Sequence, residues 1–188
     1  MVAIEHLPQR RFTVEEYDAM IAAGVLHEDE RVELIEGRIV QMAPIGIKHA
    51  VCTDETARAL IERLGRRVYV RIQGPLLLAP GSEPEPDIIV ARPGAERYRS
   101  AHITPQDVLL VIEVADTTLR YDREVKGRLY AEAGIADYWV LDLKGSRLLV
   151  LREPREGRYR QTTILRPGGS VSPLAFPELT LSVSDLLL

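Results

Sequence analysis

Two acidic residues stand at positions where the sequence predicts the inside of a β-sheet. Asp87 follows Pro86 and opens a predicted strand, and Glu113 lies near the end of the almost unbroken apolar run 108–114. Burying an ionised carboxylate without a partner costs several kcal/mol or raises its pKa, so two such acids in one sheet require a cation or a shared proton. Oxygen ligands favour magnesium or manganese, so the pair predicts a site for one of these ions. The alternative is that both acids sit in water at strand ends.

A lysine follows these acids at a spacing that gives it polar neighbours. Asp122, Lys126 and Tyr130 recur every four residues, so on a helix they form one polar row. A lysine at the boundary between this helix and the sheet could neutralise a phosphate or orient an attacking water beside metal-bound carboxylates. The alternative is an ordinary pair of Lys126 with Asp122, worth about 0.2–0.5 kcal/mol and needing no function.

Several other kinds of site are excluded by residue spacing. The sequence contains no glycine-rich phosphate-binding motif and no nucleophile elbow. Cys52 is the only cysteine, so neither an internal disulfide nor a thiolate cluster for zinc can form. Any metal must therefore be held mainly by oxygen ligands. The histidines are too scattered to form a helical metal pair; they are His6, His27, His49 and His102.

Length and composition fit one soluble globular domain covering residues 1–188. Of these 188 residues, 46% are hydrophobic and 28% are charged. The longest apolar run, 108–115, contains Glu113 and is far shorter than the roughly 20 residues of a bilayer helix, so we expect no membrane span. Residues 1–10 lack a basic start followed by an apolar core, so the cytoplasm is the expected location.

Charge is unevenly distributed along the chain. The formal net charge of -4 does not suggest a nucleic-acid-binding protein, which usually carries a basic surplus. Two arginine-rich stretches could nevertheless face a phosphate backbone, although each taken alone is more typical of ordinary solvated surface. The first comprises Arg58, Arg63, Arg66, Arg67 and Arg71, and the second Arg147, Arg152, Arg155, Arg158, Arg160 and Arg166.

The elements that must position these residues follow from caps and apolar periodicity. Thr13 and Glu16 form a capping-box pattern that predicts a helix to about Ala23. Apolar positions at helical spacing predict helices over 48–64 and 120–133, each followed by a glycine. Alternating runs on either side of Gly37 predict a hairpin over 31–36 and 38–42, and further strands are predicted over 68–72, 76–78, 87–91, 108–114, 137–143, 147–151 and 158–165.

The order of these elements predicts the fold class. The middle of the chain reads strand, helix, strand, and hairpins lie outside it, which indicates an α/β (α+β) fold with a mixed β-sheet and antiparallel edges. The run 108–114 is the best candidate for the centre of the sheet, because its Val and Ile content is typical of a strand covered on both faces.

The combination of these residues resembles a known nuclease superfamily. Pro86-Asp87, Glu113 within Val-Ile-Glu-Val, and Asp122 with Lys126 are similar to the PD-(D/E)xK pattern of the restriction-endonuclease-like fold. More narrowly, the chain resembles the Uma-two family of bacterial proteins. The segments that carry the resemblance cover most of the chain; they are residues 32–37, 85–90, 111–118 and 121–142.

The resemblance implies roles for individual residues. Asp87 and Glu113 would bind the metal, with the Val114 carbonyl as a further ligand, and Glu33 would correspond to an acid from an N-terminal element, for which Glu36 competes. His49 matches a histidine that often follows the opening hairpin and would contact substrate or the metal's water shell. A surface or helix-start histidine is an equally good interpretation of this residue.

One departure from the superfamily pattern concerns the lysine. The usual motif places Glu and Lys two positions apart, on the same face of a strand, but that position here is Ala115. By the resemblance, Lys126 on the following helix takes over this role, as a migrated lysine, and Asp122 and Tyr130 assist it or contact substrate.

The resemblance implies a magnesium- or manganese-dependent endonuclease that hydrolyses DNA phosphodiester bonds. Glu33, Asp87, Glu113 and Lys126 would be its catalytic residues, and the protein would act as a homodimer on DNA. Two alternatives remain open at this stage. One is a non-catalytic module that keeps the nuclease fold and binds DNA or a protein partner, which the net charge and Ala115 favour. The other is a structural dimer formed through strand edges or the tail 186–188.

Overall fold

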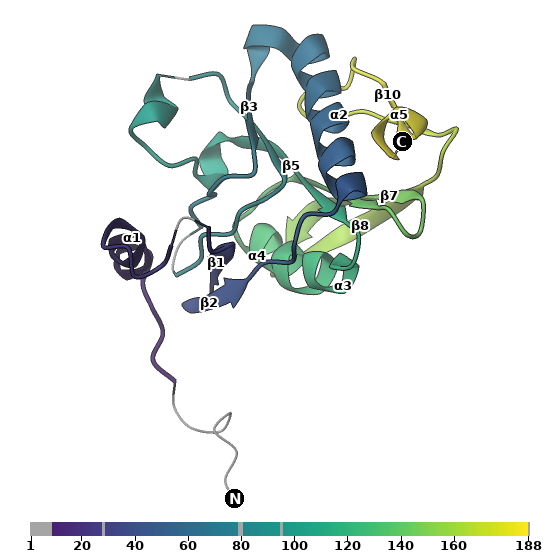
Figure 1. The fold of residues 1–188 in the computed structure, drawn as a ribbon. Helices are drawn as coiled ribbons and strands as arrows, with labels where there is room; N and C mark the ends of the chain where they lie inside the picture. Colours follow the sequence, from purple (N-terminus) through teal and green to yellow (C-terminus); the bar gives the residue numbers. More distant parts are fainter. Residues whose placement is uncertain (1–8, 28, 79–80, 95, 188) are drawn as a thin grey trace, which may run out of the picture.

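A six-stranded mixed sheet forms the centre of the fold (Figure 1). The computed structural model describes residues 9–27, 29–78, 81–94 and 96–187. The strand order is β3-β4-β5-β6-β7-β8; β5 and β6 are parallel, and the other neighbouring pairs in this sheet are antiparallel. The strands are β3 (Tyr69–Ile72), β4 (Ile88–Ala91), β5 (Val108–Ala115), β6 (Asp137–Asp142), β7 (Arg147–Arg155) and β8 (Arg158–Leu165).

Strand β5 occupies an interior position of this sheet, as its composition predicts. It pairs with β4 on one side, where Ile88 lies opposite Ile112, and with β6 on the other, where Glu113 lies beside Val140. From Leu110 to its end the strand is buried. A charged side chain therefore stands within the buried part of an interior strand, one residue beyond Ile112.

Helices cover both faces of the sheet (Figure 1). Helix α2 (Ile47–Leu64) packs on one face together with α5 (Val183–Leu187), through residues such as Leu60 and Leu186. The other face is covered by α4 (Gly127–Glu132), through Leu129 and Tyr130. These two layers confirm the mixed sheet flanked by helices that the element order predicts.

The helix predicted over 120–133 contains an irregular turn. It begins with α3 (Leu119–Tyr121), continues as a π-helical segment, η5 (Asp122–Lys126), and ends with α4. The wider turn leaves the Asp122 carbonyl to accept from the Gly127 N–H and also from the Tyr138 hydroxyl, at 2.9 Å. Such π turns occur mostly as single insertions, frequently at functional sites.

The N-terminal elements follow the predicted caps and turns. Helix α1 (Val14–Ala22) carries the expected capping box, with Thr13 and Glu16 bonded to each other's backbone N–H. The hairpin of β1 (Val32–Ile35) and β2 (Arg38–Gln41) turns at two residues with positive φ, the second of which is Gly37 at +73°.

The segment predicted as a strand over 76–78 is not a strand of the sheet. Leu76 makes an isolated bridge to Ile103, and Leu78 makes one to Ser82. Proline and glycine residues around this segment interrupt regular pairing. The remaining short elements are η2 (Gly65–Arg67), η3 (Arg97–Arg99), η4 (Pro105–Asp107) and the antiparallel pair β9 (Ser170–Val171) and β10 (Leu181–Ser182).

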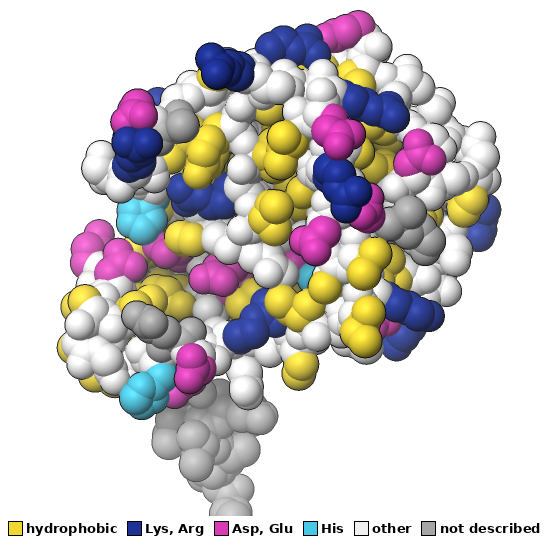
Figure 2. All heavy atoms as spheres, turned by 45° about the horizontal axis from the view of Figure 1, so that its top comes forward, with side chains coloured by type: hydrophobic (Ala, Val, Ile, Leu, Met, Phe, Trp, Pro, Cys, Tyr) yellow, Lys and Arg dark blue, Asp and Glu magenta, His cyan; other side chains and the backbone are white. Residues whose placement is uncertain are grey.

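The arginine-rich stretches are largely engaged with the protein itself. In the first, Arg67 pairs with Glu178 and Arg63 donates to the Thr180 carbonyl; in the second, Arg152 pairs with Asp137. On the face shown in Figure 2, Lys and Arg side chains are spread among acidic and hydrophobic ones and form no continuous basic surface. Within the described residues these stretches resemble ordinary solvated surface.

The C-terminal tail packs against the body of the protein. Leu186 in the C-terminal tail is fully buried against α2, where its carbonyl accepts a hydrogen bond from Cys52, so this part of the tail is not free to bind a second copy. Leu188 lies outside the described residues.

Among the helices that the structure describes, none combines the length and the apolar character needed to cross a bilayer.

Candidate active site

A cavity of about 690 Å³ opens where the ends of β4 and β5 meet the β1–β2 hairpin, the start of α2 and the α3–α4 helix. Its walls carry more acidic than basic side chains. The basic ones are Arg31 and Lys126, with His49 as a titratable neighbour; the acidic ones are Glu33, Glu85, Asp87, Glu113, Asp116 and Asp122.

Asp87 and Glu113 are neighbours across the β4–β5 pair. The pairing of Ile88 with Ile112 places Asp87 and Glu113 opposite each other at the next position. The Asp87 N–H donates to Glu113 Oε2 at 3.4 Å, and the Val114 N–H donates to Asp87 Oδ2 at 2.8 Å. Both acids are nearly inaccessible to solvent, so neither sits in water at a strand end.

Lys126 extends from the π-helical segment to the two buried glutamates. Its Nζ lies 3.0 Å from Glu113 Oε1 and 3.2 Å from Glu33 Oε2, and only 4% of the side chain is exposed. Burial opposes the charged ammonium, but the carboxylates of Glu113 and Glu33 outweigh it and raise the pKa of Lys126. The lysine is therefore held as a cation inside the protein.

Of the two acids on the opening hairpin, Glu33 reaches the cavity. Its Oε1 accepts from the Tyr121 hydroxyl at 2.9 Å, and its Oε2 accepts from the Glu85 N–H at 3.1 Å. Glu36 stands in the exposed turn and pairs with Arg128 at 2.9 Å, outside the cavity. The difference follows from their places in the hairpin, because Glu33 is a buried residue of β1 while Glu36 belongs to the turn.

His49 lies on the first turn of α2, against Asp87. Its Nε2 is 3.2 Å from Asp87 Oδ2, and its buried Nδ1 has no hydrogen-bond partner. Burial lowers the pKa of His49, but the contact with Asp87 more than compensates and raises it. Burial alone would raise the pKa of Asp87. The contacts with His49 and the Val114 N–H outweigh burial and lower this pKa below its usual value, so the carboxylate is ionised.

Tyr130 and Asp122 occupy different places around Lys126. Tyr130 is fully buried, and its hydroxyl donates to Glu113 Oε1 at 2.8 Å from behind the cavity. Asp122 lines the cavity, and its Oδ2 accepts from the Thr118 hydroxyl at 2.6 Å. Burial raises the pKa of Asp122 to about 6, although Lys126 and the Thr118 hydroxyl oppose this.

The donor atoms of the cavity fit a hard divalent cation. Burial raises the pKa of Glu113 well above its usual value; Lys126 partly offsets this, and the negative charge of Asp87 adds to it. The Lys126 ammonium is thus the counter-ion of more than one carboxylate, and the remaining negative charge of the cavity favours binding of a further cation. Carboxylate and carbonyl oxygens are the ligands that magnesium and manganese prefer, and Asp87, Glu113 and Val114 supply them here.

The cavity also contains residues to which the sequence analysis assigned no role or a different one. Glu85 lines it beside Glu33, and burial raises the pKa of its carboxyl, with Glu33 adding to the effect. The sequence pattern that could have identified Glu85 is its spacing from Asp87, because residues two positions apart in an extended segment point to the same side. Tyr121 was assigned no role, yet its hydroxyl contacts Glu33.

A search of known proteins and structures gave two findings. No curated protein matches the chain. A crystal structure of "a putative nuclease belonging to DUF820" from Anabaena variabilis ATCC 29413 matches with a TM-score of 0.72 and 20% sequence identity. The match covers 94% of this chain and 97% of that one. At 20% identity it shows that the two proteins share a fold.

The family assignment rests on sequence. The family model of Uma2, the Uma-two family of the sequence analysis, is described as "Putative restriction endonuclease", and it matches residues 14–184. This range spans the opening helix, the whole central sheet and the start of α5. The chain belongs to the Uma2 family.

Proposed function

We propose that the protein is a metal-dependent endonuclease that hydrolyses DNA phosphodiester bonds in the cytoplasm. The observation that carries the proposal is the position of Lys126. Its ammonium lies within 3.2 Å of both Glu113 and Glu33, beside the point where Asp87 and Glu113 meet. A buried cation next to a surplus of carboxylates that can hold a metal ion is an arrangement that supports phosphodiester hydrolysis.

In this proposal Asp87, Glu113 and the Val114 carbonyl hold a magnesium or manganese ion. When bound, the ion would polarise the phosphate and lower the pKa of the attacking water. Asp87 is ready for this role, because His49 and the Val114 N–H keep its carboxylate ionised. His49, which lines the cavity, would contact the substrate.

Lys126 orients the attacking water and offsets the negative charge that develops on the phosphate. Glu33 holds the ammonium on one side and Glu113 on the other. Tyr130 acts as a positioning residue, because it has no exposed surface and reaches the site only through Glu113. Asp122 positions the same helix through Thr118 and contributes charge at the cavity wall.

The migrated lysine removes the main objection to activity. Ala115 leaves the usual strand position without a charge, but the helix supplies an ammonium at hydrogen-bond distance from Glu113. This contact favours a nuclease over a binding module that has lost its catalytic lysine. A two-fold symmetric dimer would present one site to each strand of a duplex, so the proposal includes a homodimer, for which the exposed edge strand β8 is the candidate surface.

Plasmid nicking tests the proposal. The full chain should convert supercoiled DNA to open-circular and linear forms with magnesium or manganese, and not with EDTA. Asp87→Asn and Glu113→Gln should each lower the rate at least about hundredfold while retaining the circular-dichroism spectrum of the parent. Asp54→Asn, on the exposed side of α2, is the matched control and should leave the rate unchanged. Equal rates in all four proteins would contradict the proposal, and DNA binding without cleavage would favour the non-catalytic module.

A further inference from the structure

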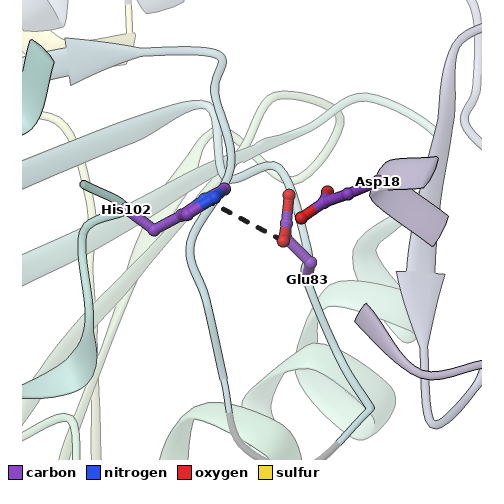
Figure 3. A group of neighbouring side chains, drawn as sticks. All are labelled: Asp18, Glu83 and His102. Carbon is purple, nitrogen blue, oxygen red and sulfur yellow. Dashed lines mark ion pairs between the residues drawn. The ribbon is translucent and has the colours of Figure 1, made fainter. Parts of the chain in front are cut away.

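A second group of potential metal ligands lies outside the cavity (Figure 3). Asp18 comes from α1, Glu83 from the segment between β3 and β4, and His102 from the loop before η4. Figure 3 shows Asp18 and His102 pointing toward Glu83 from opposite sides. Within the described residues, this is the one trio of His, Cys, Asp or Glu side chains whose ligand atoms all lie within 4.8 Å of one another.

One oxygen of the central carboxylate of this group lacks a hydrogen-bond partner. The side chain of Glu83 is only 6% exposed, and its buried Oε2 has no hydrogen-bond partner. This same atom faces His102 Nδ1 at 4.0 Å, beyond hydrogen-bond distance. Buried polar atoms in native proteins are almost always paired, so an orphaned carboxylate oxygen aimed into a set of ligands indicates a missing ligand. Burial, with Asp18 adding to it, raises the pKa of Glu83 to about 7.

The backbone around each ligand is held in place. Glu83 exchanges backbone hydrogen bonds with Leu34, at 2.7 and 3.3 Å. Asp18 follows the buried Tyr17, whose hydroxyl donates to the Val32 carbonyl at 3.0 Å. His102 precedes the buried Ile103, which bridges to Leu76. All three positions are therefore fixed before any ion binds.

We propose that Asp18, Glu83 and His102 form a binding site for a divalent cation of the zinc class. Two carboxylate oxygens and one imidazole nitrogen are a ligand set that suits zinc, with a fourth position left for water. Zinc bonds of about 2.0–2.2 Å place neighbouring ligand atoms roughly 3.3 Å apart, so the side chains need to move inward by less than an ångström at the His102–Glu83 contact.

The bound ion would fasten α1 to the body of the protein. Asp18 lies on this helix, whereas Glu83 and His102 belong to loops packed around the central sheet. The cavity ligands Asp87 and Glu113 take no part, so the inference does not depend on the proposed nuclease activity. Its chemistry also differs, because a histidine nitrogen selects a softer cation than a site built from oxygen atoms alone.

Zinc titration of the tag-free full chain tests the proposal. The background protein carries Asp87→Asn and Glu113→Gln, so the cavity lacks the carboxylates proposed to bind metal. In this protein, calorimetry with zinc chloride alone should show one saturable site. Adding His102→Ala or Glu83→Gln should weaken binding at least about hundredfold. Adding His27→Ala, at an exposed histidine outside the trio, is the matched control and should leave the affinity unchanged.

Thermal unfolding supplies a second measurement. Zinc should raise the melting temperature of the background protein by several degrees relative to EDTA, and it should have no effect once His102→Ala is added. His102 is exposed, so this variant retains the fold, which its melting temperature in EDTA would verify. Unchanged zinc affinity in both His102→Ala and Glu83→Gln, or no saturable site in the background protein, would overturn the proposal.

Discussion

The Lys126 ammonium and the Glu113 carboxylate meet at 3.0 Å inside the protein, although they are 13 residues apart and belong to a helix and a strand. Both side chains are almost completely buried. The same ammonium contacts Glu33 at 3.2 Å, so a single cation joins the hairpin, the central sheet and the helix that covers it. The residue proposed to be catalytic thus also links three parts of the fold.

The first prediction concerns the cost of breaking this contact. Lys126→Met should abolish nicking and lower the free energy of unfolding by about 3–5 kcal/mol, because it leaves buried carboxylates without their cation. The double variant Lys126→Met, Glu113→Gln should recover part of that loss, since one of the stranded charges is removed. Urea denaturation of the parent, both single variants and the double variant measures the coupling. Strictly additive effects would show that the two groups do not interact.

Most of the local structure could be predicted from the sequence, because its signals are local. The capping box at Thr13 sets the start of α1, and the apolar run 108–114 identifies the enclosed strand. Periodicity also placed Lys126 on the correct side of its helix. The π-helical turn was missed, because it depends in part on the Tyr138 hydroxyl that contacts the Asp122 carbonyl from another element.

The assembly of the candidate site was less predictable. Tyr121 has an apolar ring and a polar hydroxyl, so its residue type alone does not reveal the hydrogen bond to Glu33, which lies 88 residues away. The choice between Glu33 and Glu36 also needed the fold, because the predicted strand included both acids, whereas the strand ends at Ile35 and leaves Glu36 in the turn. Long-range contacts of this kind leave no trace in the local pattern.

The second prediction tests Tyr130 as a positioning residue. Tyr130→Phe removes the hydroxyl that donates to Glu113, so it should lower the free energy of unfolding by about 1–3 kcal/mol. It should also weaken manganese binding about ten- to hundredfold, as expected when a residue supporting a metal ligand is lost. Calorimetric titration with manganese gives the affinity, in the background His102→Ala so that the second site does not contribute.

Tyr159→Phe is the matched control for this variant. Its hydroxyl also donates a hydrogen bond from a partly buried ring, but the acceptor is the Ile135 carbonyl, away from the cavity. We expect a loss of about 0.5–1.5 kcal/mol in stability and unchanged manganese affinity. If both variants lower the affinity equally, Tyr130 contributes only to folding.

The third prediction concerns pH and the single cysteine. Burial raises the pKa of Cys52 to about 11, while the contact with Thr56 slightly opposes this. The folded state therefore favours the protonated thiol, and this contribution to stability is complete below about pH 9 and lost as the pH rises through 11. At pH 8 a thiol reagent should react roughly a hundredfold more slowly with the native protein than with the urea-unfolded chain. Equal rates would mean that α5 does not cover Cys52.

The last prediction separates the two glutamates of the opening hairpin. Glu33→Gln removes one of the two carboxylates that hold the Lys126 ammonium, so nicking should fall at least about hundredfold. Glu36→Gln is the same substitution three residues later, at an exposed ion pair with Arg128. It should change the nicking rate by at most about twofold and the free energy of unfolding by at most about 0.5 kcal/mol. Plasmid nicking in magnesium measures both variants, and circular dichroism verifies their folds. A larger loss of activity in Glu36→Gln than in Glu33→Gln would assign the catalytic acid to the turn, and the cavity described here would then not be the active site.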